Sequence, residues 1–244
     1  MLQVIILAAG HGKRMNSDIP KPLIEVGGKP IIQHLLDSIK ISGICEKPIA
    51  VIGQKAELVK EKLGDQVEYV VQEEQLGTGH AVAVCKEKLK DTDEDILVLY
   101  GDHPLLKADS LKKLADLHQK EQSTITLMTN TVKNFDDWRE PFIQFGRIIR
   151  TDNQIREIVE KKDCTPEQLE IKEVNPGYYC FNQNWLWQNI DKLKNENAQG
   201  EYYLTDLVKM AIDQNQKVLS SNIEPKEALG VNTAEQLEIV KKLV

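Results

Sequence analysis

The fold is decided by the stretch VIILAAGHGKRM at residues 4–15. Its β-branched and aliphatic start predicts a strand that is buried on both faces of a parallel sheet. The small residues and glycines that follow let backbone N–H groups come close to a ligand. Lys13, Arg14 and, further along, Lys21 add cations to the same segment. A strand followed at once by a glycine-bearing turn with cations suits the binding of a polyphosphate.

This turn matches neither of the two commonest glycine-loop motifs. The dinucleotide-binding pattern requires a glycine or an alanine where Met15 stands, and the P-loop requires Ser or Thr where Arg14 follows Lys13. An ordinary glycine-containing turn in a strand-first α/β protein therefore stays open when this stretch is taken alone.

The composition is that of an ordinary globular chain. The 244 residues, 41% of them hydrophobic and 28% charged, suffice for one large α/β domain or two small ones. The net charge of −7 provides no overall basic field, so we expect neither a nucleic-acid nor a membrane partner. No apolar run is long enough to span a bilayer, and the short apolar start lacks the basic region of a signal peptide. We therefore expect a cytoplasmic protein.

The cysteines give no sign of a zinc cluster or of a disulfide framework. Four are present, and they are scattered without any Cys-x-x-Cys pair.

Strands and helices alternate through the first half of the chain. Strands are expected at 4–7, 48–53, 67–72, 95–100 and 124–132, with helices at 30–41, 55–63, 78–89 and 109–119 between them. Asp109-Ser110 is the expected cap of the last of these helices. The alternation predicts an α/β fold with a doubly wound, mostly parallel sheet and a ligand at the carboxyl ends of its strands.

The alternation breaks after Thr131. Residues 133–142 carry few apolar positions and are expected to form a surface excursion, and 144–160 predicts a hairpin that turns at Asp152-Asn153. A strand at 178–181, helices at 184–193 and 204–215, a strand at 217–223 and a terminal helix from 233 complete the expected elements. With no internal repeat and no low-complexity linker, the chain is interpreted as one domain with a second, smaller lobe.

Two further segments at expected strand ends could carry chemistry. QEEQLGTGH at 72–80 places amides and glycines between a strand and a helix, although Thr78 could equally be a simple helix cap. YGDHPL at 100–105 sets Asp102 directly after an apolar strand, a position typical of a metal ligand in α/β enzymes. A helix-cap role for Asp102 is the weaker alternative, and His103 is expected to be a polar loop residue rather than a ligand.

The second lobe offers a less specific set of residues. Gly146, Glu160, Asn175 and Asn232 have plain interpretations when taken singly: a hairpin glycine, part of a solvated charge run, a turn residue and a position just outside a helix cap.

Taken in order, these segments are far more specific than any one of them. LAAG-x-G-x-RM, PKPL, Q-x-x-QLGTGHA, YGD-x-PL, FGRI, N-x-G and GVN resemble the motifs of the sugar-1-phosphate nucleotidylyltransferases. The narrowest signature, NAQGEYYLTD at 197–206, is similar to that of the uridylyltransferases that make UDP-N-acetylglucosamine. The resemblance covers essentially all 244 residues.

The resemblance implies a Rossmann-like nucleotidyltransferase sheet with a smaller sugar-binding β lobe. The nucleotide-binding half would be at about 1–132, the sugar-binding lobe at about 133–232 and a terminal helix at 233–244. UTP and N-acetylglucosamine-1-phosphate would be the substrates and Mg²⁺ the cofactor. The nucleotide would contact Leu7, Ala9, Gly10, Gln72, Gly77 and Thr78. Arg14 and Lys21 would hold the triphosphate, and Asp102 and Asn232 would share the magnesium ion. The sugar site would be lined by Tyr100, Gly146, Glu160, Asn175, Tyr203 and Thr205.

The chain departs from these uridylyltransferases in three ways. The left-handed β-helix of the bifunctional enzymes, which carries acetyltransferase activity, is missing, so we expect a monomer or weak dimer that does not acetylate. Pro22 stands where valine is common, and Pro176 stands in the Asn-x-Gly turn where threonine is usual. The two prolines bear on the choice of sugar more than on the nucleotide.

The residues themselves agree with this chemistry. A sugar phosphate is already an anion, so its attack on a nucleotide phosphorus requires no Ser-His-Asp triad, and catalysis rests on alignment and charge neutralisation. Two other functions stay open: the same reaction with dTTP, CTP or another sugar phosphate, and a non-catalytic sensing module on the same fold.

Overall fold

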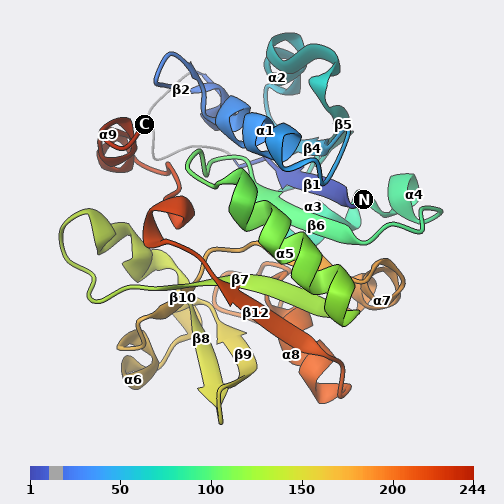
Figure 1. Ribbon diagram of the computed structural model, residues 1–244, viewed down its shortest axis with the longest axis vertical. Helices are drawn as coiled ribbons and strands as arrows, with labels where there is room; N and C mark the ends of the chain where they lie inside the picture. The colour runs from blue at the N-terminus through green and yellow to red at the C-terminus, as the bar shows by residue number, and fades with distance from the viewer. Residues whose placement is uncertain (11–18) are drawn as a thin grey trace.

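The computed structural model describes residues 1–10 and 19–244. In this part of the chain ten strands form one sheet in the order β5-β4-β1-β6-β11-β7-β10-β8-β9, with β12 paired to β7 (Figure 1). The strands are β1 (Gln3–Leu7), β4 (Ile49–Ile52), β5 (Glu68–Val71), β6 (Ile96–Tyr100), β7 (Ile125–Thr131), β8 (Gly146–Thr151), β9 (Gln154–Val159), β10 (Glu173–Asn175), β11 (Tyr179–Phe181) and β12 (Val218–Asn222). A separate ribbon pairs β2 (Glu25–Val26) with β3 (Lys29–Pro30).

The expected α/β fold with a mostly parallel sheet is confirmed. β5, β4, β1 and β6 are parallel neighbours, and β12 is parallel to β7. β11 lies antiparallel between β6 and β7, and β10, β8 and β9 extend the sheet from β7 by antiparallel pairing. β11 reaches the sheet from β10, so it enters at the edge where β6 and β7 end and must run against them. The short β10 has no counterpart among the expected elements.

The central strands are buried on both faces, as their sequences predict. In β1, Val4 and Ile6 join one core, while Ile5 joins the other. Helices α1 (Ile31–Ser42) and α5 (Ala108–Glu121) cover the first face (Figure 1). Helices α3 (Thr78–Ala83), α7 (Gln183–Asn189) and α8 (Asp206–Asp213) cover the second. Residues beyond 132 therefore contribute strands and helices to the main sheet, and the two expected lobes share it.

The remaining helices are short. They are η2 (Lys21–Leu23), α2 (Ala56–Leu63), η3 (Gly64–Gln66), α4 (Lys86–Leu89), η4 (Asp137–Gln144), η5 (Lys161–Asp163), α6 (Pro166–Leu169), η6 (Ile190–Lys192), η7 (Pro225–Ala228) and α9 (Ala234–Lys241).

Two helix expectations are corrected. The single helix expected at 78–89 is divided into α3 and α4 at Val84 and Cys85, where the buried Cys85 occupies the core. Helix α5 begins at Ala108, so its N-cap is Lys107 and not Asp109-Ser110. The backbone N–H of Lys107 donates to the buried carboxylate of Glu227, which fixes this helix start to the end of the chain.

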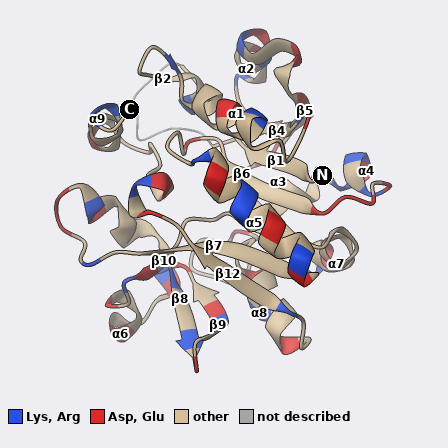
Figure 2. Cartoon of the chain, viewed as in Figure 1, with Lys and Arg blue, Asp and Glu red and all other residues tan. Residues whose placement is uncertain are grey.

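Helix α5 is amphipathic, with one buried face and one exposed face. Leu111, Leu114 and Ala115 are buried against the sheet, and acidic and basic residues alternate along the outer face (Figure 2). Along residues 1–10 and 19–244, no helix has both the length and the apolar character needed to cross a bilayer.

The segment expected to be a surface excursion, 133–142, is anchored to the fold. It contains most of η4, where Phe142 is fully buried and Arg139 nearly so. The anchor is Arg147, which is 1% exposed and has its guanidinium 4.9 Å from the centroid of the Phe135 ring. It donates to the main-chain oxygens of Ile143 and Phe145, just after the segment, and of Leu169. Since no carboxylate takes part in these bonds, the guanidinium serves as a donor to three carbonyls of two segments.

Arg147→Ala should reduce the free energy of unfolding by about 3 kcal/mol. The substitution leaves buried carbonyl oxygens without a hydrogen-bond donor and opens a cavity. Arg156→Ala, which truncates an exposed arginine on the adjacent β9, should change it by less than about 0.5 kcal/mol. Urea unfolding of both variants measures the difference, and equal effects would contradict the anchoring role.

The strand order also fixes where a ligand can bind. From β1 the chain passes to β4 on one side, and β6 lies on the other, so the order reverses between β1 and β6. Ligands of open α/β sheets bind outside the carboxyl ends of the strands at such a point. The segments after β1, β5 and β6 all emerge at this edge.

Candidate active site

A cavity of about 480 Å³ opens at this edge of the sheet. Its volume falls in the range of small-molecule sites. Most residues of the predicted site line it: Leu7, Ala9, Gly10, Lys21, Gln72, Gly77, Thr78, Tyr100, Asp102, Gly146, Glu160, Asn175 and Asn232. Tyr203 and Thr205 do not, and Arg14 lies outside the described residues.

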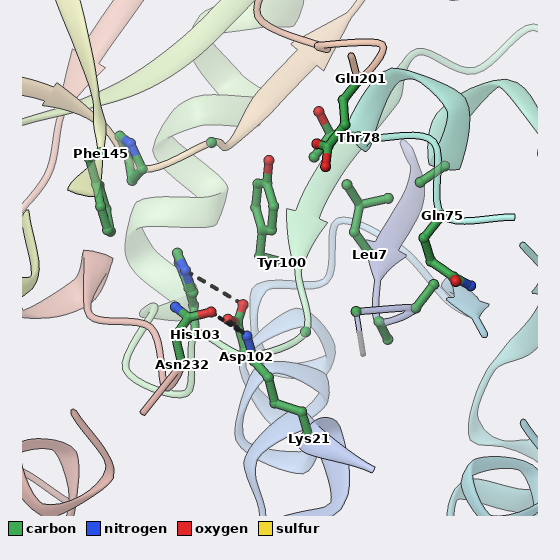
Figure 3. Close-up of a pocket in the computed structure, with 18 of the residues that line it drawn as sticks. Leu7, Lys21, Gln75, Thr78, Tyr100, Asp102, His103, Phe145, Glu201 and Asn232 are labelled. Carbon is green, nitrogen blue, oxygen red and sulfur yellow. Dashed lines mark hydrogen bonds and ion pairs between the residues drawn. The ribbon is translucent and has the colours of Figure 1, made fainter. Parts of the chain in front are cut away.

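The centre of the cavity is a contact between Lys21, Asp102 and Asn232 (Figure 3). The Lys21 ammonium forms an ion pair with Oδ2 of Asp102 and donates to Oδ1 of Asn232 at 2.6 Å. The backbone N–H of Val231 donates to the main-chain oxygen of Asp102 at 3.0 Å, which brings the segment before α9 beside the end of β6. Burial alone would raise the pKa of the Asp102 carboxyl, but the Lys21 ammonium outweighs it and holds the pKa below its ordinary value.

This arrangement fits a hard cation. The lysine ammonium already bridges one carboxylate and one amide oxygen, so the two side chains converge on a position that favours positive charge. The described residues contain no group of three or more His, Cys, Asp and Glu side chains suited to a metal ion. A cation at this point would therefore depend on the amide oxygen of Asn232.

His103 is not the polar loop residue expected from the sequence. It is 5% exposed, lines the cavity and lies in an aromatic stack between Tyr100 and Phe145. Its Nδ1 contacts the hydroxyl of Tyr178, and its Nε2 lies 3.6 Å from Oδ1 of Asp102. Burial lowers the pKa of the imidazole, although the Asp102 carboxylate opposes the shift.

One wall of the cavity is built on the glycine turn before α3. Gly77 has φ +111°, and a Cβ there would lie 2.6 Å from the main-chain oxygen of Tyr202, so only glycine fits. Thr78 is not a helix cap, since its hydroxyl accepts from the backbone N–H of Leu204 at 3.0 Å. The distinctive segment 197–206 is thus fastened to the turn by its backbone.

Gln72 supports this wall from beneath. It is buried, and its amide nitrogen contacts the main-chain oxygen of Gly77 at 3.3 Å and Nδ1 of His80 at 3.0 Å. Both N–H groups of the amide are engaged in this way, so its oxygen is left to accept from a ligand.

Another part of the cavity wall carries a carboxylate. Glu160 follows β9, and its Oε2 lies beside the open face of Gly146, 3.5 Å from the Cβ position of that glycine. Thr205 stands behind the cavity and donates to Oε1 of Glu160 at 3.2 Å, which explains why it does not line the wall. Tyr203 is also set back, and its hydroxyl accepts from Gln199 at 2.9 Å. Burial raises the pKa of Glu160.

Asn175 lines the cavity although the rigid Pro176 follows it in the turn. The Asn175 side-chain oxygen accepts from the backbone N–H of Gly177 at 3.0 Å, so the turn closes across the proline. Gly177 has φ +89°, and a Cβ there would lie 2.2 Å from the Tyr100 ring. The glycine is therefore what allows Tyr100 to stand in the cavity.

Several lining residues were missed by the sequence analysis: Gln75, His103, Gln144, Phe145 and Glu201. Most are neighbours of motif residues, since His103 follows Asp102, Phe145 precedes Gly146 and Glu201 lies within the 197–206 signature. Their position next to a motif residue is the feature of the sequence that could have identified them as lining residues.

An open α/β sheet with a small-molecule cavity at the carboxyl ends of its strands is typical of ligand-binding α/β proteins. A family model described as "Nucleotidyl transferase" matches residues 3–226, and the chain belongs to this family. The chain is 41% identical over 245 residues to the "Bifunctional protein GlmU" of Acetivibrio thermocellus, covering 100% of this chain and 51% of that protein. It is 42% identical over 242 residues to the protein of the same name from Clostridium novyi, covering 98% and 51%.

These matches confirm the family inferred from the motifs. The chain spans about half the length of the curated relatives it matches. Among solved structures, a UDP-glucose pyrophosphorylase in complex with UDP-glucose superposes with a TM-score of 0.79 at 19% identity, covering 100% of this chain and 98% of that one. This likeness shows the shared fold.

Glu160→Gln should stabilise the protein increasingly as the pH rises. The folded protein holds the Glu160 proton more tightly than the unfolded chain does, so stability is lost as the pH rises from the ordinary value of 4.5 through the raised pKa. Glutamine does not ionise, so the variant does not lose this stability as the pH rises. Thr205→Val should act in the opposite direction, because it removes a donor to the ionised carboxylate.

Melting temperatures of both variants and the parent protein, taken from pH 4 to pH 8, test this expectation. A Glu160→Gln difference that is constant over this range would contradict it.

Proposed function

We propose that this protein transfers the uridylyl group of UTP to N-acetylglucosamine-1-phosphate, forming UDP-N-acetylglucosamine and pyrophosphate. The observation that carries the proposal is that one cavity joins three kinds of surface. Gln72 with Gly77 and Thr78 forms one surface, Glu160 with Asn175 forms a second, and Lys21 with Asp102 forms a third. The nucleotide would contact the first surface, the sugar the second and their phosphates the third.

The proposed reaction is an in-line displacement. A phosphate oxygen of the sugar phosphate bonds to the α-phosphorus of UTP, and the bond from that phosphorus to the bridging oxygen breaks and releases pyrophosphate. The nucleophile is an anion, so no residue has to remove a proton from it. Lys21 would neutralise charge on the phosphates, and the walls would align the two substrates. Mg²⁺, held by Asp102 and Asn232, would supply further charge neutralisation when bound.

The Gln72 side chain favours uracil as the base of the nucleotide substrate. Its free group is an acceptor oxygen, because its nitrogen is engaged by Gly77 and His80. Uracil presents an N3–H donor at its edge, whereas the same atom of cytosine is an acceptor. Thymine shares the donor, so this argument favours UTP over CTP and leaves dTTP to be tested.

The sugar assignment is supported by similarity and by the polar wall. The matched relatives are named GlmU, and the 197–206 signature is fastened to the nucleotide wall. Glu160 could accept from sugar hydroxyls, and the Asn175 amide nitrogen could donate to a carbonyl such as that of an acetamido group.

Asp102→Asn should reduce kcat/KM at least about a thousandfold, since a bound metal contributes several kcal/mol of transition-state stabilisation. Asparagine keeps the shape of the side chain but leaves the Lys21 ammonium without its ionic partner, so circular dichroism is used to check that the variant is folded. Asp109→Asn, an exposed carboxylate in the first turn of α5, is the matched control and should be unchanged. Pyrophosphate release in the presence of Mg²⁺ measures both, and near-normal turnover by a folded Asp102→Asn protein would refute the role.

A matrix of four nucleoside triphosphates against several sugar phosphates tests the function as a whole. We expect UTP with N-acetylglucosamine-1-phosphate to give the highest kcat/KM. The preference over glucose-1-phosphate should be about 5- to 150-fold, which corresponds to about 1–3 kcal/mol for an amide partner left unpaired.

Two outcomes of this matrix would replace the proposal. Equal or better use of glucose-1-phosphate would keep the uridylyltransferase and change its sugar. No turnover with any pair, together with binding of a sugar nucleotide, would indicate a sensing module.

A further inference from the structure

A second cavity, of about 570 Å³, is formed by the β8–β9 hairpin, the end of α8 and the start of β12 (Figure 1). Its volume falls in the range of small-molecule sites. It shares no lining residue with the active-site cavity. The two cavities are therefore separate, and the second one has no part in the proposed reaction.

The charges that line this second cavity are all positive. They belong to Arg150, Arg156 and Lys217, and none of the described residues in its wall is Asp or Glu. The chain as a whole has 38 acidic and 31 basic residues, so the arrangement is opposite to the overall charge. Glu173 pairs with Arg150 and Glu121 pairs with Lys217, each at 2.7 Å, but neither carboxylate lines the cavity. Within residues 1–10 and 19–244, Arg156 has no such partner. One positive charge is left for a ligand.

Arg150 is held in place by its neighbours. Its guanidinium donates to the two carboxylate oxygens of Glu173 at 2.8 and 2.7 Å. It also donates to the hydroxyl of Ser220 and to the main-chain oxygen of Asn153, both at 2.9 Å. A guanidinium has five N–H groups, so these bonds leave one N–H of Nη1 without a partner. A fixed donor therefore remains in the same wall as the guanidinium of Arg156.

The rest of the wall suits a small polar molecule. The amides of Gln154 and Asn215 are exposed and can bond to hydroxyl groups, while Ile155, Ile212 and Leu219 offer an apolar surface of the kind that a sugar ring packs against. The guanidinium fork matches two oxygens of a phosphate, and a phosphate has a further oxygen for the other donors of the wall.

Two elements connect this cavity with Glu160 in the active site. Strand β9 begins at Gln154, in the wall of the second cavity, and ends at Val159, next to Glu160. Helix α8 runs the other way, since it starts after Thr205, which donates to Glu160, and carries Ile212 at its far end. The two elements pack side by side (Figure 1). A ligand that contacts the far ends of both can therefore displace Glu160 and Thr205 relative to each other.

We propose that this second cavity binds a small phosphate-bearing molecule of about the size of a sugar phosphate, and that its occupancy changes the environment of Glu160. The binding part is independent of the proposed function. The second part rests on it, because Glu160 acts there as a sugar-binding residue.

Methyl NMR of protein with ¹³C-labelled isoleucine methyl groups tests the binding without turnover. Ile155 and Ile212 line the second cavity, whereas no isoleucine of the described residues lines the active-site cavity. The probe is glucose-6-phosphate, and glucose and glucuronate are its neutral and carboxylate counterparts. We expect glucose-6-phosphate to shift both methyl signals saturably, and the two counterparts to bind at least about tenfold more weakly.

Arg156→Gln is the variant that removes the unpaired charge. It should weaken the binding of glucose-6-phosphate at least about tenfold, because charge-assisted hydrogen bonds to the phosphate are lost. Lys209→Gln is the matched control. It removes the same charge from an exposed position of α8 outside the cavity wall and should change binding less than about twofold. Unshifted Ile155 and Ile212 signals, equal binding of glucose or glucuronate, or equal effects of the two variants would overturn the site.

Kinetics with N-acetylglucosamine-1-phosphate test the link to Glu160. Glucose-6-phosphate should change the KM of this substrate at least about fivefold in the parent protein but not in Arg156→Gln. An unchanged KM with the cavity occupied, or the same change in the variant, would overturn the link. Methyl shifts in a parent protein that transfers no nucleotide would refute the proposed function and leave the second binding site standing.

Discussion

The ion pair between Lys21 and Asp102 is the interaction on which the site depends. Both side chains are largely buried, with exposed fractions of 14% and 11%, so neither charge can be left without a partner. Asn232 completes the contact, and the three residues come from the start, the middle and the end of the chain. One polar contact at the edge of the sheet thereby joins three distant parts of the chain.

The sheet supplies the rigid frame for this contact. Its central strands are buried on both faces, which leaves their carboxyl ends as the place where polar groups can gather. The antiparallel β11 adds a second source of residues at the same edge, because the chain must reach β11 through the turn at Asn175–Gly177. The wall built on Gly77 and Thr78 and the wall that carries Glu160 and Asn175 are therefore parts of one structure.

The site is also where the protein accepts unfavourable local interactions. Glu160 is a carboxylate whose burial raises its pKa, and the ion pair of Lys21 and Asp102 is largely withdrawn from solvent. Gly177 and Gly77 hold backbone conformations that other residues adopt with difficulty. Such features are expected where a ligand supplies the missing partner.

The sequence by itself determined the elements, the fold class and most of the cavity lining. Periodicity finds β1 and β6 because strands buried on both faces are continuously apolar, and motif order finds Asp102, Lys21 and Asn232 because local spacing is preserved in sequence. Only the tertiary structure decided the antiparallel insertion of β11, the anchoring of 133–142 by Arg147 and the set-back positions of Tyr203 and Thr205. It also decided the environment of His103, because Tyr178, Gly230 and Phe145 reach the ring from distant parts of the chain. Contacts between distant segments leave no periodic pattern, so no local signal in the sequence could predict them.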